Sequence, residues 1–423
     1  MSSLSSSAEV RSRWLKGLIG GFTLCLMGVT WPLWSASLSW DSPRIPWWEC
    51  LTTAPPLLDG IGLSAALLGA AGLVVTTWSS TARVRIFSPL LFVLGIGLLV
   101  SLDQHRLQPW VVQFLLFGLF ALFASGEVFL RGARWMVIAI YLWSAISKMD
   151  VTFLSQQGQL FLNGLLDPLG IDHTYWSPAF KQRIAAGFPA GELLTALLLL
   201  SPRTRRWGLV LSVLLHTVLI GILAFGLGHE WGVLIWNVYF ILQNLILFRP
   251  ISRIRPATVS ETPFMVRRSW NWSWGIPLFA ITYPALELAG ACDHWPAWGV
   301  YCARPAQVKI LIPDYATENL PDQLKSHLGL PAPLDERLPL SLDAWCFETR
   351  RCPIYPQERY RLALAVALLK SHLAENAIAV EIRSTPNRWT GARTLTTLNG
   401  FNEIEQHCRK QFLLNTTPRQ SPQ

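Results

Sequence analysis

Three ionisable side chains lie inside or at the ends of long apolar stretches, where a charge is costly and usually serves a function. Lys148 ends one stretch, Glu192 begins another, and His216 lies near the centre of a third. Loss of hydration favours the neutral amine, so a lysine at an apolar boundary can act as a base near pH 7. A quinol or similar lipid-soluble acid would reach such a base from the membrane, so the position of Lys148 permits this chemistry without showing it.

Each of these residues also has a structural interpretation. Lys148 could extend its ammonium to the membrane surface and pair with Asp150 or Glu192. A neutral His216 could bond a neighbouring helix. Asp103 and Arg106 are three residues apart and could form a local ion pair. The residues alone leave the catalytic and structural interpretations open.

Other polar residues fall near the same predicted membrane face as Lys148, and we expect them to line one pocket. The pocket candidates are Asp103, Gln113, Asp150, Glu192, Asn237 and Glu287. The spacing of His and Cys residues indicates no metal site, because there is no Cys-x-x-Cys pair.

The apolar stretches that position these residues are long enough to cross a bilayer, which takes about 20 helical residues. Hydrophobic residues make up 51% of the chain and charged residues only 14%, against roughly 25% charged in soluble domains. The first stretch exceeds the core of a signal peptide, so we interpret it as a span. Nine spans are predicted, at residues 17–38, 57–78, 86–102, 109–125, 133–149, 187–201, 207–227, 231–248 and 274–290.

The basic residues indicate the orientation of these spans, because short cytoplasmic loops are enriched in Lys and Arg. With the N-terminus in the cytoplasm, the outer segments up to residue 290 hold only Arg44, Arg106, Lys148, Lys181 and Arg183. The cytoplasmic segments then hold Arg11, Arg13, Lys16, Arg83, Arg85, Arg131, Arg134, Arg203, Arg205, Arg206, Arg249, Arg253, Arg255, Arg267 and Arg268. We therefore predict a multi-pass protein of the cell membrane in contact with the lipid bilayer. Basic residues in short loops also argue against nucleic-acid binding.

Residues 291–414 are soluble in composition and predict a small extracytoplasmic α+β domain. Residues 308–312 and 378–382 have the β-branched content of strands, and residues 360–373 read as a helix. Disulfides persist outside the cytoplasm. The local guess for the pairing is Cys292 with Cys302 and Cys346 with Cys352, among three possible pairings.

The fold class is thus an all-α polytopic membrane domain of about nine helices plus this α+β domain. Residues 14–290 form the membrane domain, and residues 1–13 and 415–423 are expected to be disordered.

Residues 141–153, Tyr-Leu-Trp-Ser-Ala-Ile-Ser-Lys-Met-Asp-Val-Thr-Phe, resemble the membrane domain of vitamin K-dependent gamma-glutamyl carboxylase. They equally resemble the bacterial horizontally transferred transmembrane (HTTM) proteins. The shared pattern is a tyrosine, small residues, a lysine, a hydrophobe, an aspartate and an aromatic residue. The resemblance covers roughly residues 10–250 and includes the motifs at 101–110, 191–194, 201–206 and 215–216.

This resemblance implies that Lys148 is the base that deprotonates a reduced, vitamin K-like quinone, with His216 as a supporting polar residue. In the carboxylase, oxygenation then yields an alkoxide that removes a proton from a substrate glutamate. The carboxylase pattern has a glycine at Ala145 and a second lysine at Ser147, and its lumenal part is much larger. Carboxylation of protein glutamates is therefore not expected. The alternative is a non-catalytic membrane component that anchors or supports an extracytoplasmic partner.

Overall fold

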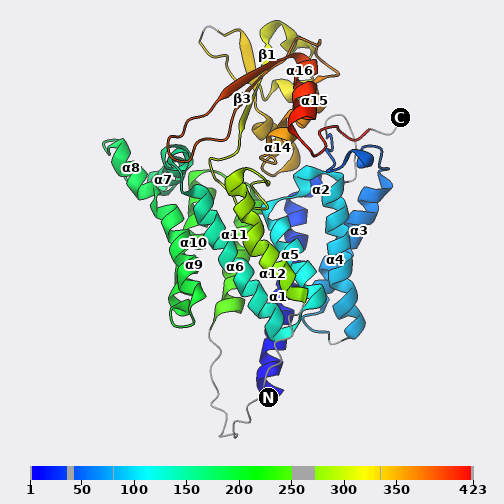
Figure 1. Cartoon of the computed structure of the whole chain (residues 1–423), viewed down its shortest axis with the longest axis vertical. Helices are drawn as coiled ribbons and strands as arrows, with labels where there is room; N and C mark the ends of the chain where they lie inside the picture. Colours follow the sequence, from blue (N-terminus) through cyan, green and yellow to red (C-terminus); the bar gives the residue numbers. More distant parts are fainter. Residues whose placement is uncertain (1, 36–41, 80, 250–271, 334, 421–423) are drawn as a thin grey trace.

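A computed structural model describes residues 2–35, 42–79, 81–249, 272–333 and 335–420 of the 423-residue chain. A bundle of long helices carries a smaller domain with a β-sheet at one end (Figure 1). The main helices of the bundle are α1 (Ser2–Val29), α3 (Leu57–Val75), α4 (Ala82–Leu102), α5 (Pro109–Phe123), α6 (Gly126–Lys148), α9 (Gly187–Leu200), α10 (Arg205–Gly221), α11 (Trp231–Phe248) and α12 (Gly275–Thr282).

Shorter segments complete the bundle near the C-terminal domain. These are α2 (Trp31–Trp34), α7 (Gly158–Leu166) and α8 (Pro178–Ala185), the π-helical turns Phe153–Gln157 and Ile222–Gly226, and the 3-10 turns Glu49–Leu51, Gln104–Arg106, Asp167–Leu169 and Tyr283–Ala289. Helices α7 and α8 lie in the connection between α6 and α9.

The chain is an integral, multi-pass membrane protein. Six described helices are long and apolar enough to cross a membrane: Leu57–Val75, Ala82–Leu102, Gly126–Lys148, Pro178–Leu200, Arg205–Gly226 and Trp231–Phe248. Two shorter apolar helices, Pro109–Phe123 and Gly275–Ala289, coincide with two further predicted spans. The count of nine therefore stays a prediction. Exposed apolar side chains such as Leu68, Leu94 and Val210 lie on the bundle surface, as contact with lipid requires.

Helix α6 is the centre of the bundle. In its most apolar stretch 61% of the residues are buried, against 28–44% in the other five candidate spans. It packs against α1, α9, α11 and α12. Elsewhere small residues bring helices close together: a Cβ added at Gly95 of α4 would lie 2.3 Å from the Ala66 nitrogen of α3. Close approach of this kind is the usual packing of membrane helices.

The N-terminus and the C-terminal domain lie at opposite ends of the bundle (Figure 1). The helix α1 begins at Ser2, so residues 2–13 are helical where serine content predicted disorder. Of the basic residues that indicated the orientation, Arg253, Arg255, Arg267 and Arg268 lie outside the described residues.

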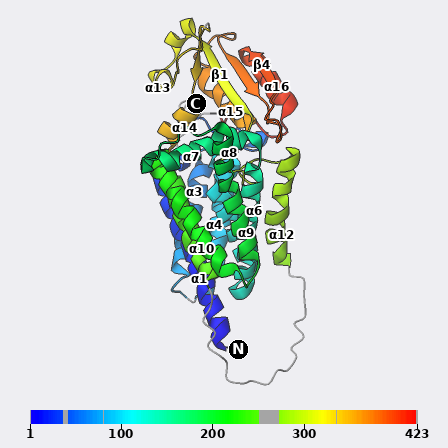
Figure 2. The ribbon, with the colours of Figure 1, turned by 90° about the vertical axis from the view of Figure 1, so that its left-hand side faces the viewer.

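The C-terminal domain contains a four-stranded antiparallel sheet in the order β2-β1-β3-β4. The strands are β1 (Gln307–Pro313), β2 (Arg337–Leu340), β3 (Ala379–Arg383) and β4 (Leu395–Asn399), and the helices are α13 (Asp322–Lys325), α14 (Leu342–Arg350), α15 (Glu358–Leu369) and α16 (Gly400–Gln411). In register, Ile310 of β1 faces Leu340 of β2 and Val380 of β3. The second view shows the strands of the sheet running from the far tip of the domain down towards the bundle, with α14 next to the bundle (Figure 2).

Candidate functional site

Lys148 and Glu192 form a buried ion pair at the C-terminal end of α6. The Lys148 Nζ lies 3.0 Å from each carboxylate oxygen of Glu192 on α9. The same ammonium donates to the hydroxyl of Ser144, at 2.5 Å, and to its backbone oxygen, at 3.2 Å. The side chain of Lys148 is 3% exposed and that of Glu192 is 13% exposed. Of the two predicted partners of Lys148, the structure therefore selects Glu192.

His216 and Asn237 continue the polar surface deeper in the bundle. The Nδ2 of Asn237 donates to the Val233 backbone oxygen, at 2.9 Å, so its Oδ1 accepts from His216 Nδ1 at 2.8 Å. His216 Nε2 is then the acceptor for the Tyr141 hydroxyl, 2.7 Å away. The Tyr141 oxygen in turn accepts from Asn244, at 2.7 Å. His216 is thus a neutral histidine with a partner at each nitrogen.

These groups line one cavity, which we call the lysine cavity. Its polar lining is Tyr141, Ser144, Lys148, Glu192, His216 and Asn237. The rest is mainly apolar and comes from α6, α7, α10, α11, the turn after α10, and a segment with Trp298, Val300 and Tyr301. It includes Phe161, Leu215, Leu219, Leu223, Val233 and Phe240. The structure therefore brings four of the sequence-predicted residues together: Lys148, Glu192, His216 and Asn237.

The other predicted pocket residues lie elsewhere. Gln113 donates to Gln243 and accepts from Trp236 Nε1, both at 2.9 Å, so it supports Trp236 and does not line the cavity. Asp150 accepts the Phe153 backbone N–H at 2.6 Å. Burial raises the pKa of this carboxyl above its ordinary value. Glu287 binds Arg304 and Arg388 and so ties the end of the bundle to the C-terminal domain.

Asp103 belongs to a cluster between the two domains, which we call the interdomain network. Its members are Arg44, Asp59, Asp103, Arg106, Arg350 and Arg419, all at most 1% exposed. The local ion pair that we considered between Asp103 and Arg106 is wrong. Asp103 pairs with Arg44 at 3.0 Å, while Arg106 and Arg419 both pair with Asp59 at 2.6 Å.

Burial and the neighbouring arginines determine the protonation states of Asp103 and His105 in this network. Burial alone would raise the pKa of Asp103, but the guanidinium groups of Arg350 and Arg44 bring it below its ordinary value. His105 accepts from Arg350 at its Nδ1 and donates to the Pro353 backbone oxygen from its Nε2, both at 2.8 Å. Burial, and secondly the charge of Arg350, lower the pKa of His105 to about 3. His105 is therefore neutral in the folded protein.

The tail of the chain takes part in this network. Arg419 donates to Asp59 and to the Ala54 backbone oxygen. Its backbone N–H donates to the Arg44 oxygen at 2.8 Å. Gln104 donates to the Asn415 backbone oxygen, also at 2.8 Å. The prediction of disorder from residue 415 is thus wrong for residues 415–420; residues 421–423 lie outside the described residues.

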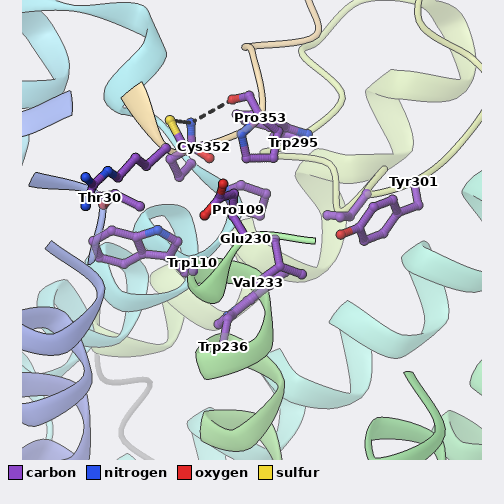
Figure 3. Close-up of a pocket in the computed structure, with 14 residues that line it drawn as sticks. Thr30, Pro109, Trp110, Glu230, Val233, Trp236, Trp295, Tyr301, Cys352 and Pro353 are labelled. Atoms are coloured by element: carbon purple, nitrogen blue, oxygen red, sulfur yellow. Dashed lines mark hydrogen bonds between the residues drawn. The ribbon is translucent and has the colours of Figure 1, made fainter. Parts of the chain in front are cut away.

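A second cavity lies between the bundle and the C-terminal domain, and we call it the interdomain cavity. It is lined by Trp110, Glu230, Trp295 and Cys352, among others (Figure 3). Val233, Trp236, Val300 and Tyr301 line both cavities. These four residues are the partition between the interdomain cavity and the lysine cavity.

All seven cysteines are free thiols in the structure, so neither of the expected disulfides is formed in it. Cys346 and Cys352 are both buried, and burial raises the pKa of Cys346 to about 12. Cys292 and Cys302 are partly exposed. The pairings stay predictions for the protein in an oxidising compartment. Among the described residues, no three His, Cys, Asp or Glu side chains gather as metal ligands do.

The residues around Lys148 lie in a segment that matches a protein-family model. The family model of methylamine utilisation protein MauE matches residues 126–233. This segment begins at α6, includes α9 and α10, and ends at the start of α11, so it contains Lys148, Glu192 and His216. The chain is therefore an integral membrane protein in which residues 126–233 are similar to the MauE family model. No curated protein and no solved structure matches the chain.

Proposed function

We propose that this chain binds a lipid-soluble small molecule in the lysine cavity, with the polar end of the molecule at the Lys148–Glu192 pair. One observation carries the proposal: a nearly buried ion pair lines a cavity whose other walls are mainly apolar. Ligand sites usually combine an apolar lining with a few placed polar groups. The pair contributes both an ammonium donor and carboxylate acceptors, and its charges balance.

The resemblance to the carboxylase and HTTM proteins adds a finer proposal, in which the ligand is a reduced quinone and Lys148 the base. An ammonium has no lone pair, so in the geometry of the ion pair Lys148 is a donor. The base role therefore requires that Lys148 first gives a proton to Glu192, 3.0 Å away. Glu192 is then a second acid–base group of the same site. His216, with both nitrogens occupied, orients Tyr141.

We also propose that the N-terminus is cytoplasmic and that the C-terminal domain is extracytoplasmic. The excess of basic residues in the segments on the N-terminal side supports this orientation. It places the interdomain cavity and the Lys148 end of the lysine cavity towards the outer face of the membrane.

A second candidate function is a non-catalytic membrane component that holds its C-terminal domain for an extracytoplasmic partner. The interdomain network favours it, because six fully buried charged residues fix that domain to the bundle. Broken buried pairs are strongly destabilising, so this attachment is rigid. The two functions are compatible unless the lysine cavity proves empty in the membrane.

Co-purification tests the binding proposal. The wild type and Lys148→Met are extracted from the same membranes, and bound small molecules are identified by mass spectrometry. Lys325→Met is the matched control, because Lys325 lies on the C-terminal domain and its side chain is 39% exposed. We expect a lipid-soluble molecule with the wild type and the control but not with Lys148→Met. Equal recovery of the same molecules from all three proteins would contradict the proposal.

A further inference from the structure

The end of the bundle at which α1 begins carries a group of charged side chains that we call the basic cluster. It consists of Glu9, Arg13 and Lys16 of α1 and Arg85 of α4. Arg13 pairs with Glu9 at 3.5 Å, and Arg85 pairs with the same carboxylate. The charges of all three residues also act on Lys16. Three basic side chains therefore share one carboxylate, and two positive charges stay uncompensated within the cluster.

Lys16 is the member of the cluster that has no anionic partner. Its Nζ lies 4.9 Å from the centre of the Phe129 ring of α6, and within the described residues it makes no hydrogen bond and no ion pair. Two neighbouring arginines differ in this respect. Arg11 and Arg134 donate to backbone oxygens in the last turn of α11, at 2.9 and 2.8 Å. Their charges stabilise the end of a helix, whereas the charge of Lys16 is available to a ligand.

Aromatic and apolar side chains around the cluster mark the boundary of the bilayer. Trp14 of α1 and Trp78, which follows α3, are 51% and 73% exposed and make an edge-to-face contact. Exposed indole rings gather at the level of the lipid headgroups. Ile86 and Phe87, which follow Arg85 along α4, are exposed as well. The cluster therefore lies between indoles at headgroup level and an apolar surface that faces the lipid chains.

A ligand that fits this position has a negative charge and an apolar part. The negative charge balances the cluster, and phosphate oxygens accept strong hydrogen bonds from lysine and arginine. The apolar part covers Ile86 and Phe87. A phospholipid provides both parts, and its headgroup decides the fit. The ammonium of phosphatidylcholine brings a further positive charge to the cluster, whereas phosphatidylglycerol carries only the negative charge of its phosphodiester.

We propose that the basic cluster binds an anionic phospholipid, with the phosphodiester at Lys16 and Arg85 and the acyl chains along Ile86 and Phe87. Basic pockets between membrane helices bind anionic headgroups in this way. This site is separate from the lysine cavity, because Phe129 lies in the first turn of α6 and Lys148 ends the same helix. The inference therefore goes beyond the proposed function and does not depend on it.

Native mass spectrometry of the full chain in detergent tests the assignment. The probes are dioleoylphosphatidylglycerol, dioleoylphosphatidylcholine and inorganic phosphate. We expect phosphatidylglycerol to bind more tightly than phosphatidylcholine, and phosphate not to displace it. Lys16→Gln should weaken the binding of phosphatidylglycerol about 5-fold, the effect of one basic residue at an anionic lipid surface. Glu9→Gln removes the carboxylate of the cluster and should strengthen this binding.

Arg206→Gln is the matched control. It also removes one positive charge near a membrane boundary, but Arg206 lies over the ring of Trp207 on α10, outside the cluster. If it weakens binding as much as Lys16→Gln does, the attraction is diffuse and the site is overturned. Equal affinity for the two lipids overturns it too, and displacement by phosphate overturns the lipid assignment. Should Lys16→Gln not fold, Glu9→Gln decides, because weaker or unchanged binding contradicts the proposal.

Discussion

Replacing Lys148 with methionine should destabilise the membrane domain strongly, because it leaves Glu192 as a buried carboxylate without its counter-ion. The pair is 3.0 Å long and its two side chains are 3% and 13% exposed, so water screens it little. Removing one partner of a buried pair typically costs about 3–5 kcal/mol. Replacing both partners with apolar residues is often nearly neutral. The double variant Lys148→Met/Glu192→Leu should therefore be more stable than Lys148→Met alone.

The assay is a double-mutant cycle on thermal unfolding of the detergent-solubilised protein. A lone buried carboxylate escapes its cost by taking up a proton. The loss in Lys148→Met should therefore be smaller at pH 5 than at pH 8, while the double variant shows no such difference. Additive effects of the two single substitutions would refute the reasoning, since residues in contact must couple. Lys325→Met serves again as the control, and it should unfold as the wild type does.

Three further predictions concern the interdomain network and the cysteines. The pKa of folded His105 is about 3, below an unfolded value of about 6.5, so its contribution to stability is present above pH 6.5 and lost as pH falls towards 3. His105→Gln, which keeps a donor and an acceptor, should flatten this part of the unfolding profile, and an unchanged slope would contradict it. Arg419→Met removes the tail's ion pair with Asp59 and should speed release of the C-terminal domain in limited proteolysis; cleavage at the wild-type rate would refute the docking of the tail. Buried Cys346 and Cys352 should react with maleimide only after unfolding, and rapid labelling of the folded protein would exclude their burial.

The bundle helices and the inner strands of the sheet could be predicted, because residues surrounded by apolar neighbours leave a clear hydrophobic pattern in the sequence. Long apolar stretches predict the bundle helices, and β-branched residues predict β1 and β3, the two inner strands of the sheet. The edge strands β2 and β4 were missed. Arg337–Leu340 contains a proline, which is tolerated at a sheet edge but does not indicate a strand. The first three residues of Leu395–Asn399 are exposed and carry no burial pattern.

The part of the candidate site that depends only on the order and direction of the membrane helices could be predicted from the sequence. Lys148, Glu192 and His216 come together because successive antiparallel helices place them at neighbouring levels. The partners of Asp103 could not be predicted, because Arg350 lies far along the chain in another domain. Trp298 and Tyr301, which also line the lysine cavity, were missed, since tryptophan near a membrane boundary ordinarily indicates only an interfacial position.

The central claim is that the lysine cavity holds a lipid-soluble molecule by its polar end. A cryo-electron microscopy map of the full chain, extracted with its native lipids, tests this claim most directly. We expect elongated density in the cavity, with one end within hydrogen-bond distance of Lys148 or Glu192 and the rest against Phe161 and Leu219. A cavity closed by its own side chains, or a Lys148 side chain turned away towards the lipid headgroups, would contradict the claim.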